Sequence, residues 1–312
     1  MRINKLKVKN IYADKAKWDI SLTEKENIIL IRQPNDENAF IPFSPDFFEI
    51  IECIFFNDSY EYIKNMLSKK ALIECTVERQ GIEYTFGFKG NCTQQTKDGR
   101  VYMKHALDWF CAIPEGALQG ENGGWLGAQL CCDTKEYFYP NVLEEFARFD
   151  KNTYAEAPAN FVYGEEFTWL KRMAKYNKRE VDLEQKLQAI INEFTAIKLD
   201  EHISVGLDEK GEYALLFDGK TVPDEELSEQ EELWINFCGW INNLRILKQL
   251  CDFVGEEGEF PVFIDREANG IWKKYERVFF EELKKTGRQV FICLAERDER
   301  IEKYCDYVRS FP

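Results

Sequence analysis

A segment that could bind phosphate lies early in the chain, directly after an apolar stretch that reads as a strand ending at Ile31. A working phosphate loop carries glycines whose backbone amides close on the phosphate, followed by a Lys and a Ser or Thr. Here polar side chains stand at the three glycine positions, Ala39 at the lysine position and Phe40 at the hydroxyl position. The aligned residues are Gln33, Pro34, Asn35, Asp36, Glu37, Asn38, Ala39 and Phe40. The segment has the outline of a phosphate loop without its binding groups.

Two acids in this segment oppose a bound nucleotide. Asp36 and Glu37 put negative charge where a triphosphate would lie. With no cradle of amides and no lysine, the Coulomb energy is adverse by on the order of a few kcal/mol. We therefore expect no cofactor, and binding of ATP with Mg²⁺ is disfavoured.

The elements that must position this segment alternate between strands and helices. Polar–apolar alternation predicts strands, and apolar residues at helical spacing predict helices. A turn at Arg79–Gly81 predicts a hairpin. The expected strands are Arg2–Val8, Trp18–Leu22, Asn27–Ile31, Ala71–Glu78, Ile82–Phe88, Val101–Phe110, His202–Leu207, Glu212–Phe217, Phe260–Asp265 and Gln289–Leu294. The expected helices are Phe47–Phe55, Tyr60–Leu67, Glu165–Ile197 (with polar interruptions), Glu229–Leu250, Lys273–Lys285 and Glu299–Val308.

Four landmarks follow one another in a fixed order, and the order resembles a known family. They are the altered loop at 33–40, the run Leu227–Glu231, the strand that ends at Asp265 and the strand that ends near Ala295. Together with the opening Met1–Asn10, they resemble the head domain of ABC-type ATPases of the RecF and structural-maintenance-of-chromosomes (SMC) class. The resemblance implies an α/β, P-loop NTPase-like head. It would have an antiparallel β subdomain, a mostly parallel core sheet covered by helices, and no long coiled coil.

The resemblance also divides the chain into three parts. Residues 1–135 would form an N-terminal lobe with the degenerate phosphate loop. Residues 136–200 would form a helical connector. Residues 201–312 would form a C-terminal lobe that carries the signature-like run and the later strands. An ordinary α/β protein that mimics these landmarks is the alternative.

The signature of the resembled family opens a helix, and its serine and amides contact the γ-phosphate held by a partner head. Three residues match a Leu-Ser-Gly-Gly-Glu pattern, and two acidic or amide side chains replace the small positions. In order they are Leu227, Ser228, Glu229, Gln230 and Glu231. The carboxylates would repel a phosphate, although acids also suit a helix N-terminus.

Three further positions depart from the resembled family near its nucleotide. Asp265 matches the acid of the Mg²⁺ shell, but Arg266 replaces the glutamate that polarises water. Glu267 comes one residue late and would point to the opposite face of a continuing strand. Ala295 takes the position of the histidine that senses the γ-phosphate. Phosphoryl transfer depends on these groups, so we expect no catalytic residue.

The resemblance and the departures predict a catalytically inactive ATPase-like subunit, not an enzyme. It would act as a scaffold or regulator in a DNA-repair, DNA-processing or mobile-element defence assembly. Its partner would be a second copy or an intact ATPase head. One alternative is a subunit whose Ser228 completes a composite ATP site on an active partner.

Composition supplies a third alternative and several limits. The formal charge of −15, from 41 basic and 56 acidic residues, disfavours unaided binding to a phosphate backbone. The same charge would suit an acidic nucleic-acid mimic or inhibitor. No apolar run approaches the ~20 residues that span a bilayer, so we expect a cytoplasmic protein.

The cysteines do not form a metal-binding pattern. Ten cysteines are scattered through the chain without a CxxC pair, and His105 and His202 are the only histidines. A structural zinc site needs clustered Cys and His. We expect no metal, and reduced cysteines such as Cys53 and Cys293 that serve as small buried hydrophobic residues.

Overall fold

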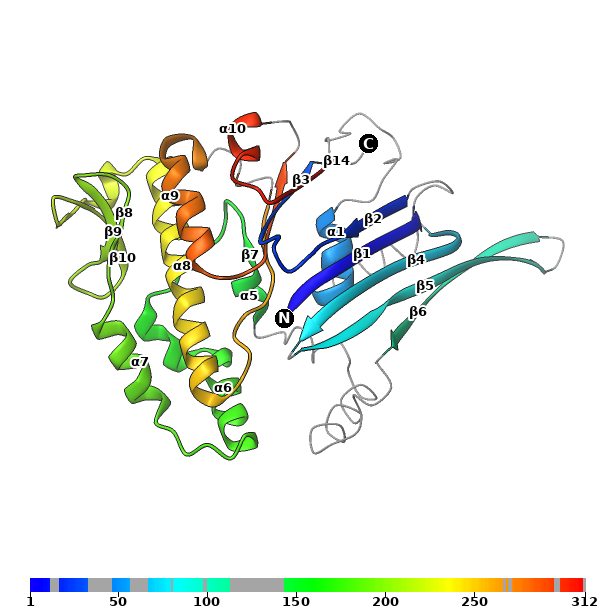
Figure 1. Ribbon diagram of the computed structural model, residues 1–312, viewed down its shortest axis with the longest axis horizontal. Helices are drawn as coiled ribbons and strands as arrows, with labels where there is room; N and C mark the ends of the chain where they lie inside the picture. The colour runs from blue at the N-terminus through cyan, green and yellow to red at the C-terminus, as the bar shows by residue number, and fades with distance from the viewer. Residues whose placement is uncertain are drawn as a thin grey trace. The chain divides into compact units, whose positions relative to one another are not determined.

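The computed structural model describes two compact units (Figure 1). Unit 1 comprises Met1–Glu144 and Phe291–Pro312, and unit 2 comprises Glu145–Val290. The compact units divide the chain at 144/145 and 290/291. The division into 1–135, 136–200 and 201–312 that the resemblance implied stays a prediction. The described residues are 1–11, 17–32, 47–56, 67–79, 81–97, 100–112, 143–265, 268, 271–294 and 298–310.

An antiparallel sheet with strand order β2-β1-β4-β5-β6 makes up much of unit 1. Its strands are β1 (Arg2–Ile11), β2 (Lys17–Ser21), β4 (Leu67–Arg79), β5 (Ile82–Lys97) and β6 (Arg100–Ala112). Alternate residues of β1 such as Leu6 and Val8 are buried, as the sequence pattern predicts. The predicted hairpin is confirmed, because β4 and β5 pair up to Arg79 opposite Ile82.

Unit 1 also contains parallel strands around the apolar strand that precedes the altered loop. The order is β14-β3-β13, with β3 at Ile28–Arg32, β13 at Val290–Leu294 and β14 at Tyr307–Ser310. β14 runs parallel to β3, and the Asp306 carboxylate accepts hydrogen bonds from the backbone amides of Asn27 and Ile28, both at 2.9 Å. β14 therefore forms an edge of this sheet, beside β3.

The helices of unit 1 are short. α1 (Phe47–Ile51) continues as a π-helical turn, η1 (Glu52–Phe56), and α10 spans Glu299–Glu302. The Phe47 ring stacks on Phe291, with ring centroids 5.6 Å apart, which packs α1 against β13. The expected helix at 60–67 lies outside the described residues except for Leu67, which begins β4.

One predicted helix of unit 1 is wrong over most of its length. The sequence pattern predicted a helix at 299–308, but α10 ends at Glu302 and β14 begins at Tyr307. Pairing with β3 decides the conformation of this short segment, because each β14 residue from Tyr307 to Ser310 has a partner there. A four-residue strand is too short to show its period in the sequence.

Unit 2 is organised around the long helix α8 (Glu229–Val254). α6 (Glu165–Tyr176), α7 (Leu183–Asn192) and α9 (Trp272–Lys285) accompany it, and Figure 1 shows α8 and α9 side by side. An antiparallel sheet of order β11-β10-β9-β8 and a parallel pair, β7 and β12, complete the unit. Their bounds are β7 (Arg148–Phe149), β8 (Ile197–Lys198), β9 (Ile203–Leu207), β10 (Tyr213–Phe217), β11 (Lys220–Thr221) and β12 (Val262–Ile264).

Two further short segments connect these elements. α5 (Glu144–Ala147) leads directly into β7, and the 3₁₀ helix η3 (Pro158–Tyr163) precedes α6. The helical run expected at 165–197 is divided, since the chain leaves the helix between Tyr176 and Leu183. Lys178 takes a positive φ of 54°, and Asp182 caps α7 by accepting from the Gln185 amide at 2.9 Å. This turn explains the polar interruption in the sequence.

Aromatic packing joins α8 to α9. The Phe237 and Phe279 rings stack with centroids 4.7 Å apart, and Trp234 meets Phe279 edge-on at 6.4 Å. All three side chains are buried. Burying a large side chain of this kind contributes roughly 1.5–3 kcal/mol, so this cluster is a major part of the core of unit 2.

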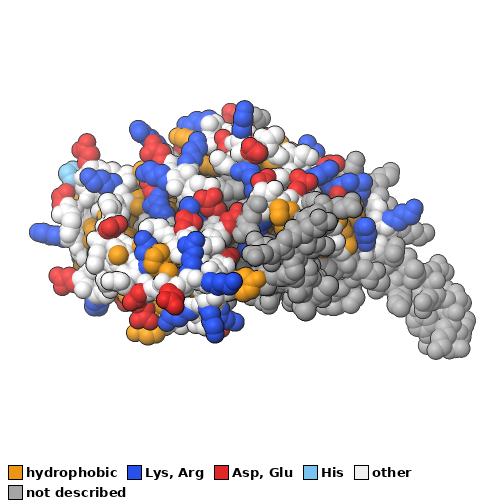
Figure 2. Space-filling model, turned by 60° about the horizontal axis from the view of Figure 1, so that its bottom comes forward, with side chains coloured by type: hydrophobic (Ala, Val, Ile, Leu, Met, Phe, Trp, Pro, Cys, Tyr) orange, Lys and Arg blue, Asp and Glu red, His pale blue; other side chains and the backbone are white. Residues whose placement is uncertain are grey.

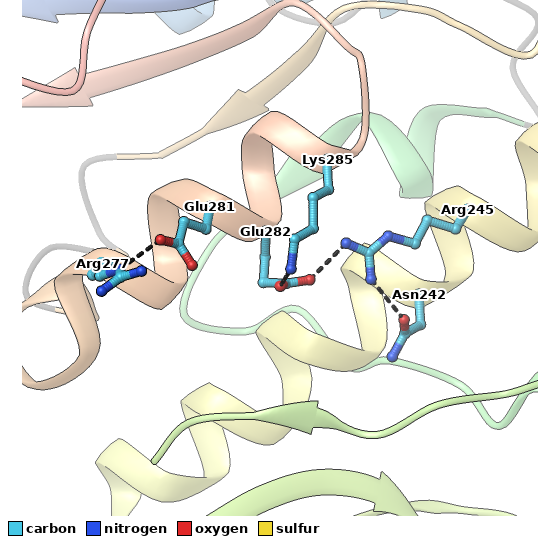
Figure 3. Close-up of polar contacts among 6 residues, drawn as sticks. All are labelled: Asn242, Arg245, Arg277, Glu281, Glu282 and Lys285. Atoms are coloured by element: carbon cyan, nitrogen blue, oxygen red, sulfur yellow. Dashed lines mark hydrogen bonds and ion pairs between the residues drawn. The ribbon is translucent and has the colours of Figure 1, made fainter. Parts of the chain in front are cut away.

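A charged cluster also joins the two helices (Figure 3). Arg245 of α8 donates to Glu282 of α9 at 2.6 Å and to Asn242 at 3.2 Å, and Lys285 donates to the other Glu282 oxygen. Near the beginning of both helices, Nζ of Lys274 lies 3.9 Å from Oε1 of Glu231. Contacts that follow the same order along both helices mean that α8 and α9 run parallel.

In the described part of the chain, no helix is both long enough and apolar enough to cross a membrane. Cys53 and Cys293 are buried, as the sequence predicted. The same part of the chain holds no group of three or more His, Cys, Asp or Glu side chains placed to share a metal ion.

Candidate functional site

The structure describes two groups of the residues that the sequence singled out. Asp265 and the run Leu227–Glu231 are described. The altered loop at 33–40, Arg266, Glu267 and Ala295 lie outside the described residues. For the loop, the flanking elements are in place: β3 ends at Arg32 and α1 begins at Phe47.

Asp265 follows the last residue of β12, where the sequence placed it. Residues 262–264 of β12 are fully buried, and the Asp265 amide donates to the Phe149 carbonyl at 2.9 Å. This bond continues the parallel pairing in which Ile264 lies opposite Phe149. Asp265 therefore sits at the carboxyl end of a buried parallel strand, the position where α/β folds bind ligands.

A guanidinium group lies beside the Asp265 carboxylate. Arg148 of β7 places Nη2 3.6 Å from Oδ2 of Asp265, and the two side chains are 29% and 15% exposed. Unit charges about 4 Å apart attract by on the order of 4 kcal/mol near a protein surface, less when water screens them. A divalent cation that approached Asp265 would meet this positive charge at the same carboxylate.

Arg148 is not among the residues that the sequence pattern singles out. A two-residue strand has no period that a pattern could reveal, and the partner acid lies far along the chain. The available signal was weak: a single Arg directly before an apolar residue, Phe149. Only the pairing of β7 with β12 brings Arg148 and Asp265 together.

The signature-like run opens α8 as a capping box. Ser228 is the N-cap residue, its hydroxyl accepts from the Glu231 amide at 3.4 Å, and the Glu231 carboxylate accepts from the Ser228 amide at 3.0 Å. The hydroxyl also donates to that carboxylate at 2.6 Å. The arrangement satisfies amides at the start of the helix within the chain itself.

The bonds of this capping box set the charge state of Glu231. Hydrogen bonds from the Ser228 hydroxyl and amide lower the pKa of Glu231, and Lys274 assists. The carboxylate is therefore held in its charged form next to the serine. In the same turn, Glu229 and Glu232 are exposed. A phosphate that approached Ser228 would meet fixed negative charge, which opposes the contact made by a working signature.

The structure thus leaves the two candidate groups in different states. Asp265 lies at the end of a strand and is paired with a cation. Ser228 is engaged in its own helix cap. The two groups belong to unit 2, and what the altered loop contributes lies outside the described residues.

Comparison with known proteins identifies the fold. No protein-family model matches the chain, and no curated protein matches it in sequence. Among solved structures, the SMC head domain from Thermotoga maritima matches with a TM-score of 0.47 and 12% identity. A second structure, an SMC head bound to the C-winged helix domain of ScpA, matches with a TM-score of 0.56 and 12% identity. Each match covers 99% of this chain and 94% of the other.

The fold class follows from the second match together with the architecture of the sheets and helices. The chain has the fold of an ABC-type ATPase head, with antiparallel and parallel sheets and helices, as the sequence predicted. Within that class the fold is that of an SMC head. At 12% identity the likeness concerns the fold alone.

Proposed function

We propose that the protein is an ATPase head that no longer hydrolyses ATP and serves as a scaffold or regulatory subunit. The observation that carries the proposal is the pair formed by Asp265 and Arg148, with Nη2 and Oδ2 3.6 Å apart. In a working head, the acid at this strand end belongs to the Mg²⁺ shell. Here a fixed cation competes for the same carboxylate.

The sequence supports the proposal independently. Ala39 replaces the lysine that neutralises phosphate charge, and Phe40 replaces the hydroxyl that binds Mg²⁺. Arg266 stands where the water-polarising acid would be, and Ala295 where the histidine would be. Each missing group removes a separate contribution to transition-state stabilisation, so one restored contact would not recover hydrolysis.

A protein partner fits this proposal. The solved SMC head of the same fold is bound to the C-winged helix domain of ScpA. By analogy, this chain would act through a bound protein, in a cytoplasmic assembly that repairs or processes DNA or defends against mobile elements. A second copy and an intact ATPase head are the two partners of this kind.

Calorimetry and a hydrolysis assay test the proposal. The full chain is titrated with ATP in the presence of Mg²⁺, and phosphate release is followed beside the Asp265→Ala variant. We expect no saturable heat and the same background rate for both proteins. Hydrolysis that Asp265→Ala abolishes would contradict the proposal, because it would require a working metal shell. Binding without hydrolysis would restrict the loss to the chemical step.

A further inference from the structure

The hairpin of β5 and β6 extends beyond the sheet that carries it (Figure 1). β4 pairs with β5 as far as Ala71 opposite Gly90, whereas β5 and β6 pair on to Lys97 opposite Arg100. Residues 91–97 and 100–106, here called the ribbon, have no third strand beside them among the described strand pairs. A two-stranded hairpin by itself has marginal stability in water, so a ligand that covers the ribbon would also stabilise it.

The ribbon is basic in an acidic chain. Residues 91–106 contain three bases and a single acid, Asp98, although the chain as a whole has a net charge of −15. Asp98 belongs to the turn between the strands and lies outside the described residues. The local excess of positive charge is therefore carried by the two strands themselves.

The pairing register places all three bases on one face of the ribbon. Residues opposite each other in an antiparallel pair share a face, and the face alternates along each strand. Lys97 lies opposite Arg100, and Lys104 lies opposite Thr93, two pairs along from it. This basic face contains no acid. Its residues are Asn91, Thr93, Gln95, Lys97, Arg100, Tyr102, Lys104 and Ala106.

The body of the sheet shows that the basic face continues the solvent side. Along β5 it continues to Lys89, which is exposed, whereas the opposite face continues to Phe88, which is buried. The row of Lys89 also includes Lys9 of β1, by way of Leu72, and one acid, Asp108. The basic face is therefore an extension of the surface of the sheet and not of its core.

The net charge of the chain does not oppose an anion at the end of the ribbon. At about 3.4 Å per residue, Lys97 and Arg100 lie roughly 24 Å along the ribbon from Gly90. Acids in the body of the sheet such as Glu74 and Glu83 are thus separated from them by more than the Debye length of about 8 Å. In the view of Figure 2, the acidic and basic side chains of the described residues are intermixed, so the excess of acids does not gather into one patch there.

The residue types of the basic face favour nucleic acid over a protein. Asn, Thr, Gln and Tyr, together with Lys and Arg, bind phosphates and the edges of bases. The centre of a protein interface needs large apolar anchors, and Tyr102 is the only aromatic residue on this face. The major groove of B-form DNA, about 12 Å wide, admits a two-stranded β-ribbon, whereas the deep major groove of duplex RNA does not.

We propose that the ribbon binds double-stranded DNA, with the basic face in the major groove. Lys97, Arg100 and Lys104 neutralise phosphates along the groove, and the amide and hydroxyl residues between them contact the bases. The contact needs neither a bound nucleotide nor a second copy of the chain. It does not rest on the loss of ATP hydrolysis, so titrations with DNA and with ATP can fail independently.

The first test is the fluorescence anisotropy of a labelled duplex DNA titrated with the full chain, without nucleotide. We expect saturable binding at 50 mM NaCl, and three phosphate contacts make the affinity fall roughly 40-fold between 50 and 200 mM NaCl. No binding at 50 mM NaCl up to 100 µM protein would overturn the proposal. Tighter binding to single-stranded DNA or to duplex RNA of the same sequence would overturn it as well, because neither offers this groove.

Removal of the three bases then locates the contact. The variant that combines Lys97→Gln, Arg100→Gln and Lys104→Gln should bind the duplex at least about tenfold more weakly and lose most of its salt dependence. Unchanged affinity would assign the binding to another surface and end the proposal. Thermal melting checks that the variant is folded, and Lys97→Gln with Arg100→Gln, at the free end of the ribbon, replaces it if it is not.

A matched control separates the ribbon from net charge. Lys198→Gln, Lys210→Gln and Lys220→Gln together make the same change of charge at exposed lysines of unit 2. This variant should bind within about twofold of the wild type. If it lost as much affinity as the ribbon variant, the effect would come from the charge of the whole chain, contrary to the proposal.

Two neighbouring glutamines test which face of the ribbon meets the DNA. Gln95 lies on the basic face opposite Tyr102, and Gln94 lies on the other face opposite Met103. Gln95→Glu and Gln94→Glu make the same chemical change one residue apart. We expect Gln95→Glu to weaken binding at least about fivefold and Gln94→Glu less than about twofold, since only the first puts a carboxylate against the duplex. Equal losses, or a larger loss at Gln94, would refute the assignment to the basic face.

Discussion

Glu282 is a carboxylate that two cations hold in its charged form. Its side chain is 8% exposed, and Arg245 and Lys285 each donate to one of its oxygens. Burial by itself would raise the pKa of Glu282, but the bonds from Lys285 and Arg245 outweigh it and lower the pKa below 4.5. Because such a pair already bears the cost of desolvation, removing one partner is more harmful than the pair is stabilising.

Glu282→Gln should therefore lower the free energy of unfolding by about 2 kcal/mol near pH 7. The folded-state pKa is depressed, so this stabilisation is present above the unfolded pKa of about 4.5 and is lost as the pH falls through the folded pKa. Urea unfolding of the wild type and the variant at several pH values measures the difference. A difference that stays constant from pH 7 down to pH 3 would contradict the assignment.

At the same scale, the sequence could place Asp265 but not its partner. The apolar run before Asp265 predicts a buried strand, and an acid at its end is visible in the sequence. Arg148 has no such signal, because β7 has only two residues. Arg148 comes close to Asp265 only because β7 pairs with β12. When two strands far apart in the sequence form a site, the pattern can therefore predict the site residue that follows the longer strand but not the one in the shorter strand.

At the scale of elements, Ser228 shows how a signature-like run can be explained by a helix cap alone. Ser228→Ala removes the hydroxyl that accepts from the Glu231 amide and donates to its carboxylate. We expect a loss of about 1 kcal/mol in unfolding free energy, the usual cost of losing an N-cap. Chemical denaturation followed by circular dichroism measures it. A neutral result would mean that the capping box does not stabilise α8.

The pairing of β4 with β5 requires a glycine at one position. Gly87 lies opposite Glu74 with a φ of 149°, and a Cβ added there would overlap the carbonyl oxygen of Ile73. Gly87→Ala should cost about 3 kcal/mol or more, from backbone strain and overlap together. Gly81→Ala is the comparison, because its φ of 73° is also positive but, apart from its neighbours in the chain, no atom of the described residues lies within 4 Å of the added Cβ. It should cost about 1 kcal/mol.

Thermal melting of both glycine variants measures the difference. Gly87→Ala should lower the melting temperature clearly more than Gly81→Ala for two reasons. A φ of 149° is almost restricted to glycine, whereas a φ of 73° lies near the left-handed region that other residues can adopt. The Cβ added at Gly87 would also overlap the Ile73 carbonyl oxygen. Equal effects would contradict the register of this strand pair.

Long strands and helices were predictable from the sequence. Short segments whose conformation depends on pairing with another strand were not. β4, β5, α8 and α9 carry enough alternating or helically spaced apolar residues to show their type. β14 was mistaken for helix, because its four residues fit either period and only β3 determines their conformation. The break between α6 and α7 depends on a positive φ at Lys178. A positive φ is uncommon for a lysine, so the sequence does not predict it.

At the scale of the whole molecule, the two units differ in how the chain builds them. Unit 1 uses two separate pieces of sequence, since 291–312 returns to it and β14 completes its strands beside β3. Unit 2 is one continuous piece, 145–290. It has its own core, which includes Phe237, Phe279 and Leu247, all fully buried. A continuous segment of this size that holds its own apolar core is able to fold alone.

We therefore expect the fragment 145–290 to fold without the rest of the chain, whereas the fragment 1–144 should not reach its native stability. The first retains the α8–α9 aromatic packing and the Glu282 cluster. The second loses the Asp306 bonds to Asn27 and Ile28 together with β14. Cooperative thermal unfolding and dispersed amide resonances would identify a folded fragment. The prediction would be wrong if 145–290 melted without cooperativity while 1–144 folded, because the discontinuous unit would then be the one that is stable by itself.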